Sequence, residues 1–229
     1  MEKNKPLEHL IGKKVFIFDT ETTGIPAKKP NTKWGTRDEY FDYYNHDAYN
    51  QSRIVSIAWY YTNNFSQDSL DISKVNYYIR KPDTFTEINN SHIHNITYDM
   101  AILQGLDIQI ILDQHNLEKH LLDCEYIIAH NVMFDVHILL NELHRINKTN
   151  LTSHILHLLD TKQCLCSGEI GKPICKLEFA NSKYPKRFKI NYKMPKLSEF
   201  YKIVFNKDME NAHNAKGDVQ ALVEILSKI

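Results

Sequence analysis

The chain has 229 residues, of which 42% are hydrophobic and 24% charged, and its Lys and Arg balance its Asp and Glu to a formal net charge of zero. This composition predicts a single globular domain over residues 1–229. It excludes a protein that binds nucleic acid or a membrane through its overall charge alone. The N-terminus is charged and no apolar run approaches the roughly 18 residues of a membrane span, so we expect an intracellular protein that is not secreted, in the cytoplasm, the nucleus or an infected host cell.

Strand-like patterns come first along the chain. We predict strands over residues 13–19, 53–61 and 74–80, where apolar residues run continuously or alternate with polar ones. The first of these ends at Asp19, and Glu21 follows two positions later. Because side chains alternate between the faces of a strand, both carboxylates point the same way and repel each other. A divalent cation with oxygen ligands would remove that repulsion, so the pair favours a metal site.

Later segments alternate helical and strand-like patterns. We predict a mostly helical stretch over residues 97–122, a strand over 126–129, a helix over 132–146, a last strand over 155–159, a helix beginning near Pro195 and a final helix after Asn214. This order predicts an α/β fold in which helices cover both faces of a mixed sheet. Residues 25–52 and 162–194 resemble long insertions, which makes both candidates for a substrate-binding rim.

Two further motifs each place a carboxylate in the first turn of a predicted helix. One is H-N-x-x-F-D at residues 130–135, which offers Asp135, and the other is H-x-A-x-x-D at residues 213–218, which offers Asp218. Either residue alone could merely complement a helix dipole. Together with Asp19 and Glu21, however, they make four carboxylates from three elements that end on the same side of the predicted sheet.

In this order, D-x-E-T-T-G, H-N-x-x-F-D and H-x-A-x-x-D resemble the three motifs of the DnaQ-like 3′-to-5′ exonucleases with a DEDDh active site. Lesser matches are R-I-V-S-I at residues 53–57, I-H-N-I-T at 93–97 and L-D-T at 159–161, and Asn95 stands where the family usually has glycine. The resemblance implies a ribonuclease H-like fold with about five strands. It also implies release of nucleoside 5′-monophosphates from the 3′ end of single-stranded DNA or RNA, with DNA favoured.

The resemblance assigns catalysis to Asp19, Glu21, Asp135, His213 and Asp218. The four carboxylates would hold two Mg²⁺ or Mn²⁺ ions, a pair that can stabilise the attacking and the leaving oxygen of a phosphodiester. The histidine would take the proton from the attacking water, because a histidine side chain ordinarily ionises near pH ~6.5.

Other polar and aromatic residues are predicted to contact the substrate. Thr20, Thr22 and Asn131 would contact the terminal nucleotide. The segment from residue 172 to 202 holds nine Lys or Arg and two Glu, so it is either a solvated loop or a phosphate-binding patch in which Lys183, Lys186 and Arg187 take part. An aromatic group in the first insertion would stack on unpaired bases or anchor its own loop; its members are Trp34, Tyr40, Phe41, Tyr43, Tyr44 and Tyr49.

Two other functions stay open at this point. A catalytically idle nucleic-acid-binding or assembly module would keep the same fold, although the complete set of motifs argues against it. A zinc-stabilised interaction domain would use Cys164, Cys166 and Cys175 with His154 and His157, although their spacing matches no standard zinc finger. The chain ends soon after the last motif, which suggests a stand-alone proofreading or trimming enzyme, and a polymerase or another replication or repair partner stays open.

Overall fold

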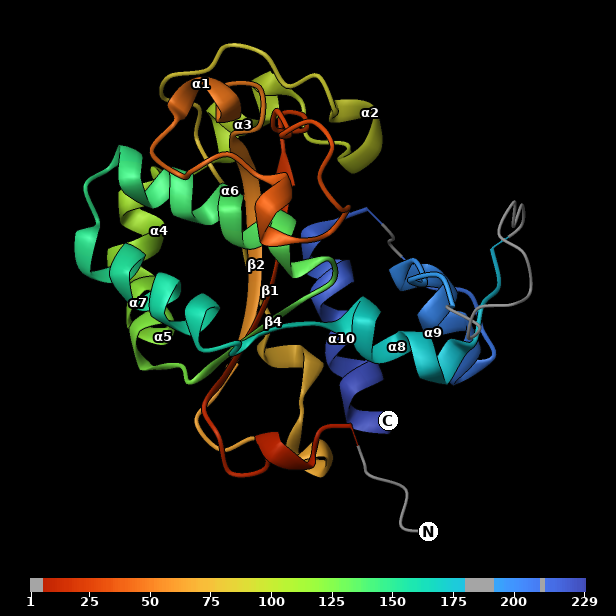
Figure 1. The fold of residues 1–229 in the computed structure, drawn as a ribbon. Helices are drawn as coiled ribbons and strands as arrows, with labels where there is room; N and C mark the ends of the chain where they lie inside the picture. The colour runs from red at the N-terminus through yellow and green to blue at the C-terminus, as the bar shows by residue number, and fades with distance from the viewer. Residues whose placement is uncertain (1–5, 180–191, 211–212) are drawn as a thin grey trace, which may run out of the picture.

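The computed structural model describes residues 6–179, 192–210 and 213–229. Within these residues five strands form one mixed sheet in the order β3-β2-β1-β4-β5 (Figure 1). The strands are β1 (Val15–Thr22), β2 (Ile54–Thr62), β3 (Asn76–Ile79), β4 (Tyr126–Ala129) and β5 (Cys164–Cys166). β1 pairs antiparallel with β2 and parallel with β4, which places it at the centre of the sheet. The predicted mixed sheet is confirmed.

Helices cover both faces of this sheet. They are α1 (His46–Tyr49), α2 (Ser91–His94), α3 (Tyr98–Gln104), α4 (Ile108–Gln114), α5 (Leu117–Asp123), α6 (Val132–Arg145), α7 (Thr149–Asp160), α8 (Ser167–Cys175), α9 (Leu197–Phe205) and α10 (Ala215–Lys228). Helices α4 to α7 lie on one face, and α10 packs on the other with α8 and α9 beside it (Figure 1). Short 3₁₀ turns are η1 (Glu8–Leu10), η2 (Arg37–Glu39), η3 (Gln67–Ser69) and η4 (Ile72–Lys74). No helix in the described ranges is long and apolar enough to cross a membrane.

The central strand is buried because helices cover it from both sides. Phe18 packs with helices α4 to α7, and its neighbour Ile17 packs with α10. Since side chains alternate along a strand, Asp19 and Glu21 point to the α10 face, whereas Thr20 points to the face that α6 covers. The two helical layers thus determine which polar side chains meet at the end of β1.

The predicted last strand, residues 155–159, is wrong. These residues belong to α7, in which Leu151, Ile155 and Leu158 are buried at helical spacing. A short apolar run does not by itself distinguish a strand from a buried helix segment. The last strand is instead β5, which pairs parallel with β4 and lies inside the segment predicted to be an insertion. Residues 162–194 therefore contribute β5 and α8 to the fold.

The predicted helical stretch over residues 97–122 is divided into α3, α4 and α5. Gly105 ends α3, and a Cβ atom there would lie 2.6 Å from the backbone nitrogen of Lys81, so only glycine allows this close approach. Asn116 has a left-handed φ of 62° and separates α4 from α5.

The first insertion, residues 25–52, is attached to α6 through hydrogen bonds. The Asn141 amide donates to the Tyr43 carbonyl at 2.6 Å. Tyr40 and Tyr49 are almost fully buried, so of the two alternatives these residues anchor the loop. Trp34 and Tyr44 are more than half exposed, and for them base stacking stays a prediction.

A buried ion network joins β2, β3 and α6. Glu142 of α6 accepts from Arg53 Nε at 2.6 Å and forms an ion pair with Arg80 Nη1 at 2.7 Å. Asp83 lies 2.9 Å from the other terminal nitrogen of Arg80, which brings the network to charge balance. The backbone N–H of Arg53 donates to the Thr23 hydroxyl at 2.9 Å. The network thus connects α6 to the end of β1.

Glu142→Gln should lower the free energy of unfolding by about 3–5 kcal/mol, because it leaves two buried guanidinium groups with too little negative charge. Urea denaturation followed by circular dichroism measures this change. The matched control is Asp208→Asn, which breaks a solvent-exposed ion pair with Lys202 and should unfold like the wild type. A Glu142→Gln protein within about 1 kcal/mol of the wild type would contradict the assigned role of the network.

Candidate metal centre

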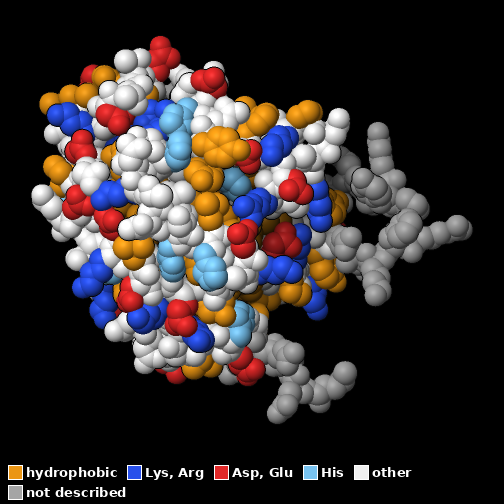
Figure 2. Space-filling model, turned by 60° about the vertical axis from the view of Figure 1, so that its left-hand side comes forward, with side chains coloured by type: hydrophobic (Ala, Val, Ile, Leu, Met, Phe, Trp, Pro, Cys, Tyr) orange, Lys and Arg blue, Asp and Glu red, His pale blue; other side chains and the backbone are white. Residues whose placement is uncertain are grey.

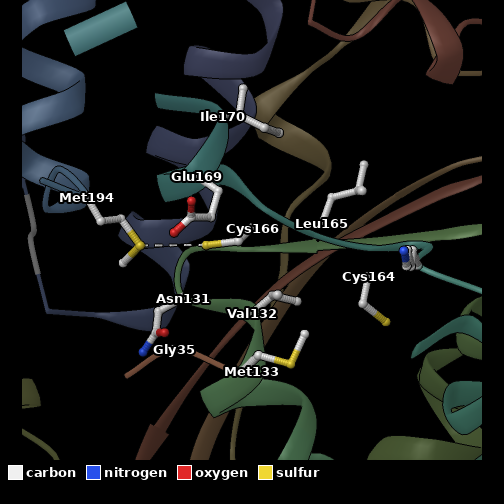
Figure 3. Close-up of a pocket in the computed structure, with 11 residues that line it drawn as sticks. Gly35, Asn131, Val132, Met133, Cys164, Leu165, Cys166, Glu169, Ile170 and Met194 are labelled. Carbon is white, nitrogen blue, oxygen red and sulfur yellow. Dashed lines mark hydrogen bonds between the residues drawn. The ribbon is translucent and has the colours of Figure 1, made fainter. Parts of the chain in front are cut away.

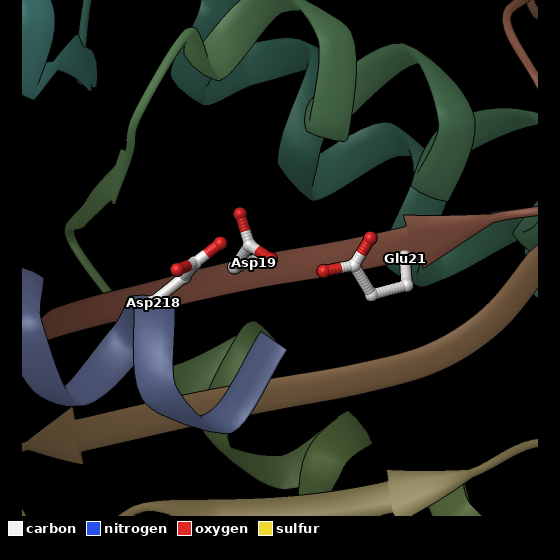
Figure 4. A group of neighbouring side chains, drawn as sticks. All are labelled: Asp19, Glu21 and Asp218. Carbon is white, nitrogen blue, oxygen red and sulfur yellow. The ribbon is translucent and has the colours of Figure 1, made fainter. Parts of the chain in front are cut away.

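Three carboxylates meet where β1 ends. Asp19 and Glu21 of β1 and Asp218 of α10 each place one oxygen so that all three oxygens lie within 4.8 Å of one another (Figure 4). All three side chains are half-buried, so the cluster is accessible from solvent. The structure therefore brings together three of the four carboxylates that the sequence predicts as metal ligands.

The start of α10 places Asp218 at this cluster. The Asn214 side chain accepts from the backbone N–H of Lys216 at 3.0 Å, and its carbonyl accepts from that of Asp218 at 2.9 Å. Asn214 is thus the N-cap, as predicted. Val219 and Leu222 are buried against the sheet, and this packing holds the first turn of α10 beside β1.

Asp135 approaches the cluster from α6, and Thr20 holds it in place. Its Oδ1 accepts two hydrogen bonds from Thr20, one from the backbone N–H at 3.0 Å and one from the hydroxyl at 2.7 Å. Asp135 is almost fully buried, and its other carboxylate oxygen has no hydrogen bond among the described residues. Asp135 lies outside the group of three mutually close oxygens but near enough for its charge to act on Asp19.

Burial raises the pKa of all four carboxyl groups, and the negative charges of neighbouring carboxylates raise three of these pKa values further. Burial, followed by the charges of Asp135, Asp218 and Glu21, raises the pKa of Asp19 well above its ordinary value. Burial raises the pKa of Glu21 to about 7, and burial with the charge of Glu21 raises the pKa of Asp218 to about 7. Burial also raises the pKa of Asp135 to about 7, although the hydrogen bonds from Thr20 oppose this shift. A divalent cation relieves this repulsion, so an all-oxygen donor set of this kind fits Mg²⁺ or Mn²⁺.

His213 immediately precedes the N-cap of α10. Its φ of 64° is left-handed, and its side chain is exposed. A backbone hydrogen bond from His213 acts on the Asp218 carboxylate and lowers its pKa. The structure thus places the His213 backbone at the cluster and its imidazole in solvent, where the side chain is free to turn.

The predicted substrate contacts have different environments. The hydroxyls of Thr20 and Thr22 are buried and donate to Asp135 and to the Gly24 carbonyl respectively. Their contact with the terminal nucleotide stays a prediction. Asn131 is half-buried, has a left-handed φ of 66° and lies just before α6. The three predicted basic contacts, Lys183, Lys186 and Arg187, lie outside the described residues.

The alternative zinc site does not form in the part of the chain that the structure describes. The carboxylate cluster is the only group of three or more potential ligands found there. His154 instead has its Nε2 3.1 Å from the Cys124 carbonyl oxygen. The predicted zinc ligands Cys164, Cys166 and Cys175 are free cysteines.

Sequence reasoning missed a pocket of about 360 Å³ beside the cluster. Figure 3 shows side chains of β5, α8 and the start of α6 around it, together with Met194 and Gly35. These segments are far apart in the sequence, and no single motif contains them. The parallel pairing of β4 with β5 places β5 and α8 beside the start of α6.

Comparisons with known proteins agree with this geometry. Residues 16–226 match the model of the RNase T family, described as exonuclease. The fold is similar to that of E. coli exonuclease I, solved as a zinc-bound complex with single-stranded DNA, with a TM-score of 0.60 and 16% identity over 94% of this chain and 40% of that one. A second structure of that enzyme, with a dT13 oligonucleotide, gives the same values. The chain thus spans about 40% of the length of exonuclease I.

A further fold similarity links the chain to cell-death related nuclease 4, with a TM-score of 0.56 and 13% identity over 94% of this chain and 62% of that one. No curated protein matches the sequence. At these identities the structural similarities establish the ribonuclease H-like fold.

Asp218→Asn should stabilise the metal-free protein at about pH 7.5 by about 1–3 kcal/mol and have less effect at about pH 4. A carboxyl group whose pKa rises from 3.8 to about 7 on folding binds more protons when folded, so its burial costs stability as the pH rises through this window. Urea denaturation in EDTA at both pH values measures the difference.

The control for this comparison is Asp208→Asn, which removes an exposed acid outside the cluster. Adding Mg²⁺ or Mn²⁺ should reverse the order of stability, because the ion binds the complete folded cluster most tightly. A pH-independent effect of Asp218→Asn, or equal stabilisation of both proteins by the ions, would contradict a cation site here.

Proposed function

The chain belongs to the RNase T exonuclease family, and on this premise we propose that it is a metal-dependent 3′-to-5′ exonuclease of the DEDDh type. Its substrate would be single-stranded nucleic acid, with DNA favoured, and its products nucleoside 5′-monophosphates. The single-stranded DNA in the exonuclease I complexes supports this substrate class. The observation that carries the proposal is the cluster of Asp19, Glu21 and Asp218 with Asp135 behind it.

In this proposal Asp19, Glu21 and Asp218 hold divalent cations, with Asp135 as a further ligand, directly or through water. Two such ions, when bound, supply Lewis-acid stabilisation of the attacking and leaving oxygens at phosphorus. Thr20 acts through Asp135: its two hydrogen bonds keep one carboxylate oxygen occupied and thereby orient the other.

His213 would accept the proton from the attacking water. A general base must come within hydrogen-bonding distance of that water, and the exposed side chain of His213 next to the N-cap of α10 has the freedom to do so. Once the proton has moved to the imidazole, the developing hydroxide attacks phosphorus and the 3′ oxygen of the shortened strand leaves.

Phosphate contacts along the strand would come from Lys183, Lys186 and Arg187, a role that stays a sequence-based prediction. On the face drawn in Figure 2, basic and acidic side chains are interspersed. Among the described residues, this face therefore offers no broad positive surface for binding the strand.

Asp19→Asn should lower the rate of Mg²⁺- or Mn²⁺-dependent hydrolysis by more than about 10³-fold while the protein stays folded, because the variant loses a central ligand. The assay follows 3′- and 5′-end-labelled DNA and RNA oligonucleotides with each metal ion or with EDTA. Asp208→Asn is the matched control and should retain activity. Shortening from the 5′ end, or full activity of Asp19→Asn, would overturn the assignment; absence of hydrolysis by the wild type would favour the idle binding module.

His213→Ala should reduce the rate by about 10²–10⁴-fold and flatten the acidic limb of the pH–rate profile, because no group then takes up the proton from water. Steady-state rates measured across the pH range provide the test. His157, an exposed histidine on α7, supplies the control variant His157→Ala, which should keep the wild-type profile. An acidic limb that survives in His213→Ala would remove His213 from this role.

A further inference from the structure

The 360 Å³ pocket lies beside β5 and the start of α6 (Figure 3). In the sheet, β4 separates β5 from β1, the strand that carries Asp19 and Glu21. β1 and β4 are parallel, with Ile17 opposite Ile128, so the same register places residue 130 beside Asp19. Asn131, the next residue, lines the pocket. β5 is two strand spacings from β1, roughly 9–10 Å at ~4.7–4.9 Å per spacing, and Met133 of the lining precedes Asp135 by only two residues on α6. A group bonded to the phosphate at the carboxylates can therefore reach the pocket.

Hydrogen bonds hold one wall of the pocket in place. His130 is half-buried directly after β4, with its Nδ1 2.9 Å from the Ser167 hydroxyl and its Nε2 3.0 Å from the Pro195 carbonyl oxygen. Ser167 begins α8, and Pro195 follows Met194, which lines the pocket. His130 therefore ties the chain around Met194 to the sheet, and this wall exists before any ligand binds.

Close packing determines where the Met194 side chain lies. Its sulfur is 3.9 Å from the sulfur of Cys166, as the dashed line in Figure 3 marks. A Cβ atom at Gly168 would come within 2.5 Å of the Met194 side chain, so the glycine leaves room for the thioether over the first turn of α8. The thioether is thus presented to the pocket in a defined position.

The opposite wall comes from the first insertion and the start of α6. Gly35 lies next to Asn131: a Cβ atom built at Gly35 would be 4.0 Å from the Asn131 side-chain oxygen. The Asn131 amide has no hydrogen-bond partner among the described residues, so its donor and its acceptor are both available. The pocket therefore combines an apolar, sulfur-containing wall with one free amide.

This combination suits a flat aromatic ring with polar edges. Sulfur atoms pack favourably on aromatic rings, and an amide can pair with the donor and acceptor atoms of a base edge. The remaining lining is largely apolar and includes Val132, Met133, Cys164, Leu165 and Ile170. Lys162 and Glu169 add charged groups to the lining.

We propose that the pocket receives one nucleobase of the substrate strand, from a nucleotide bonded to the scissile phosphate. The base packs on the Met194 thioether, and its edge hydrogen-bonds to the Asn131 amide. This inference rests on the proposed exonuclease function and adds a base-binding subsite to it. The subsite makes the last nucleotides of the strand matter more for affinity than those further away.

The test measures binding separately from hydrolysis. Fluorescence anisotropy in Mg²⁺, in an Asp19→Asn background, gives the dissociation constant of a single-stranded DNA decamer labelled at its 5′ end. Met194→Ala should weaken binding by about 3–10-fold, and Met194→Leu should weaken it less. Met100→Ala, which truncates a half-buried methionine on α3 outside the pocket, should leave binding unchanged.

Decamers that each lack one base locate the subsite. Removing one of the two bases nearest the 3′ end should weaken binding by a similar factor. This loss should disappear in Met194→Ala, because the base and the Met194 side chain contribute to affinity through their contact with each other, and removing either partner already removes that contact. Equal losses at every position, a loss that persists in Met194→Ala, or no binding of the decamer would overturn the subsite. If binding depends on the base position as expected but the wild-type protein hydrolyses no oligonucleotide, only the proposed exonuclease function would be overturned.

Discussion

The alternation of side chains along β1, between two helical layers, is the constraint on which the site depends. Helices on both faces prevent the strand from shifting by one residue, since that shift would exchange its buried and polar side chains. With this register, Asp19 and Glu21 face α10 and meet Asp218, while Thr20 faces α6 and binds Asp135. β1 thus lies between one carboxylate from each helical layer, Asp135 of α6 and Asp218 of α10, although β1, α6 and α10 are far apart in the sequence.

The two charged clusters of the fold differ in what balances them. Glu142, Arg53, Arg80 and Asp83 neutralise one another, so that network is complete without a ligand. Among the described residues the carboxylates at the end of β1 form no ion pair with a cationic side chain, and their raised pKa values reflect this unfavourable arrangement. Helix α6 connects the clusters, because Glu142 lies two turns after Asp135 on the same helix. The charge-balanced network around Glu142 therefore helps to position Asp135, a member of the carboxylate cluster. Through α6 the fold holds this energetically unfavourable cluster in place.

How much of this the sequence predicts depends on the range of the interactions involved. β1, β4, α6 and α10 follow from local patterns with clear boundaries, and the motifs at their ends identify the carboxylates and the N-cap Asn214. The apolar run at residues 155–159 misleads because its helical periodicity is visible only with Leu151 included. The role of Thr20 could not be predicted at all, since its hydroxyl looks equally suited to a nucleotide until Asp135 is found 2.7 Å away. The motifs do not report which side chains of distant segments contact each other.

The same reasoning explains why substrate preference must be sought outside the four carboxylates. The carboxylates arrange oxygen ligands around phosphorus, a chemistry that every phosphodiester shares, so they carry no information about the base. Of the motif residues, those at the start of α6, including Asn131, line the proposed subsite. Base-dependent contacts need walls at a distance of about one nucleotide, and here those walls are Gly35, Met194 and the first turn of α8. Tyr40 and Tyr49, buried under the first insertion, hold the Gly35 loop in position without touching that surface. Tyr40 and Tyr49 thus contribute to the proposed subsite only through the shape they give the loop, and the surface proposed to meet a base combines the Met194 thioether with apolar side chains and the Asn131 amide.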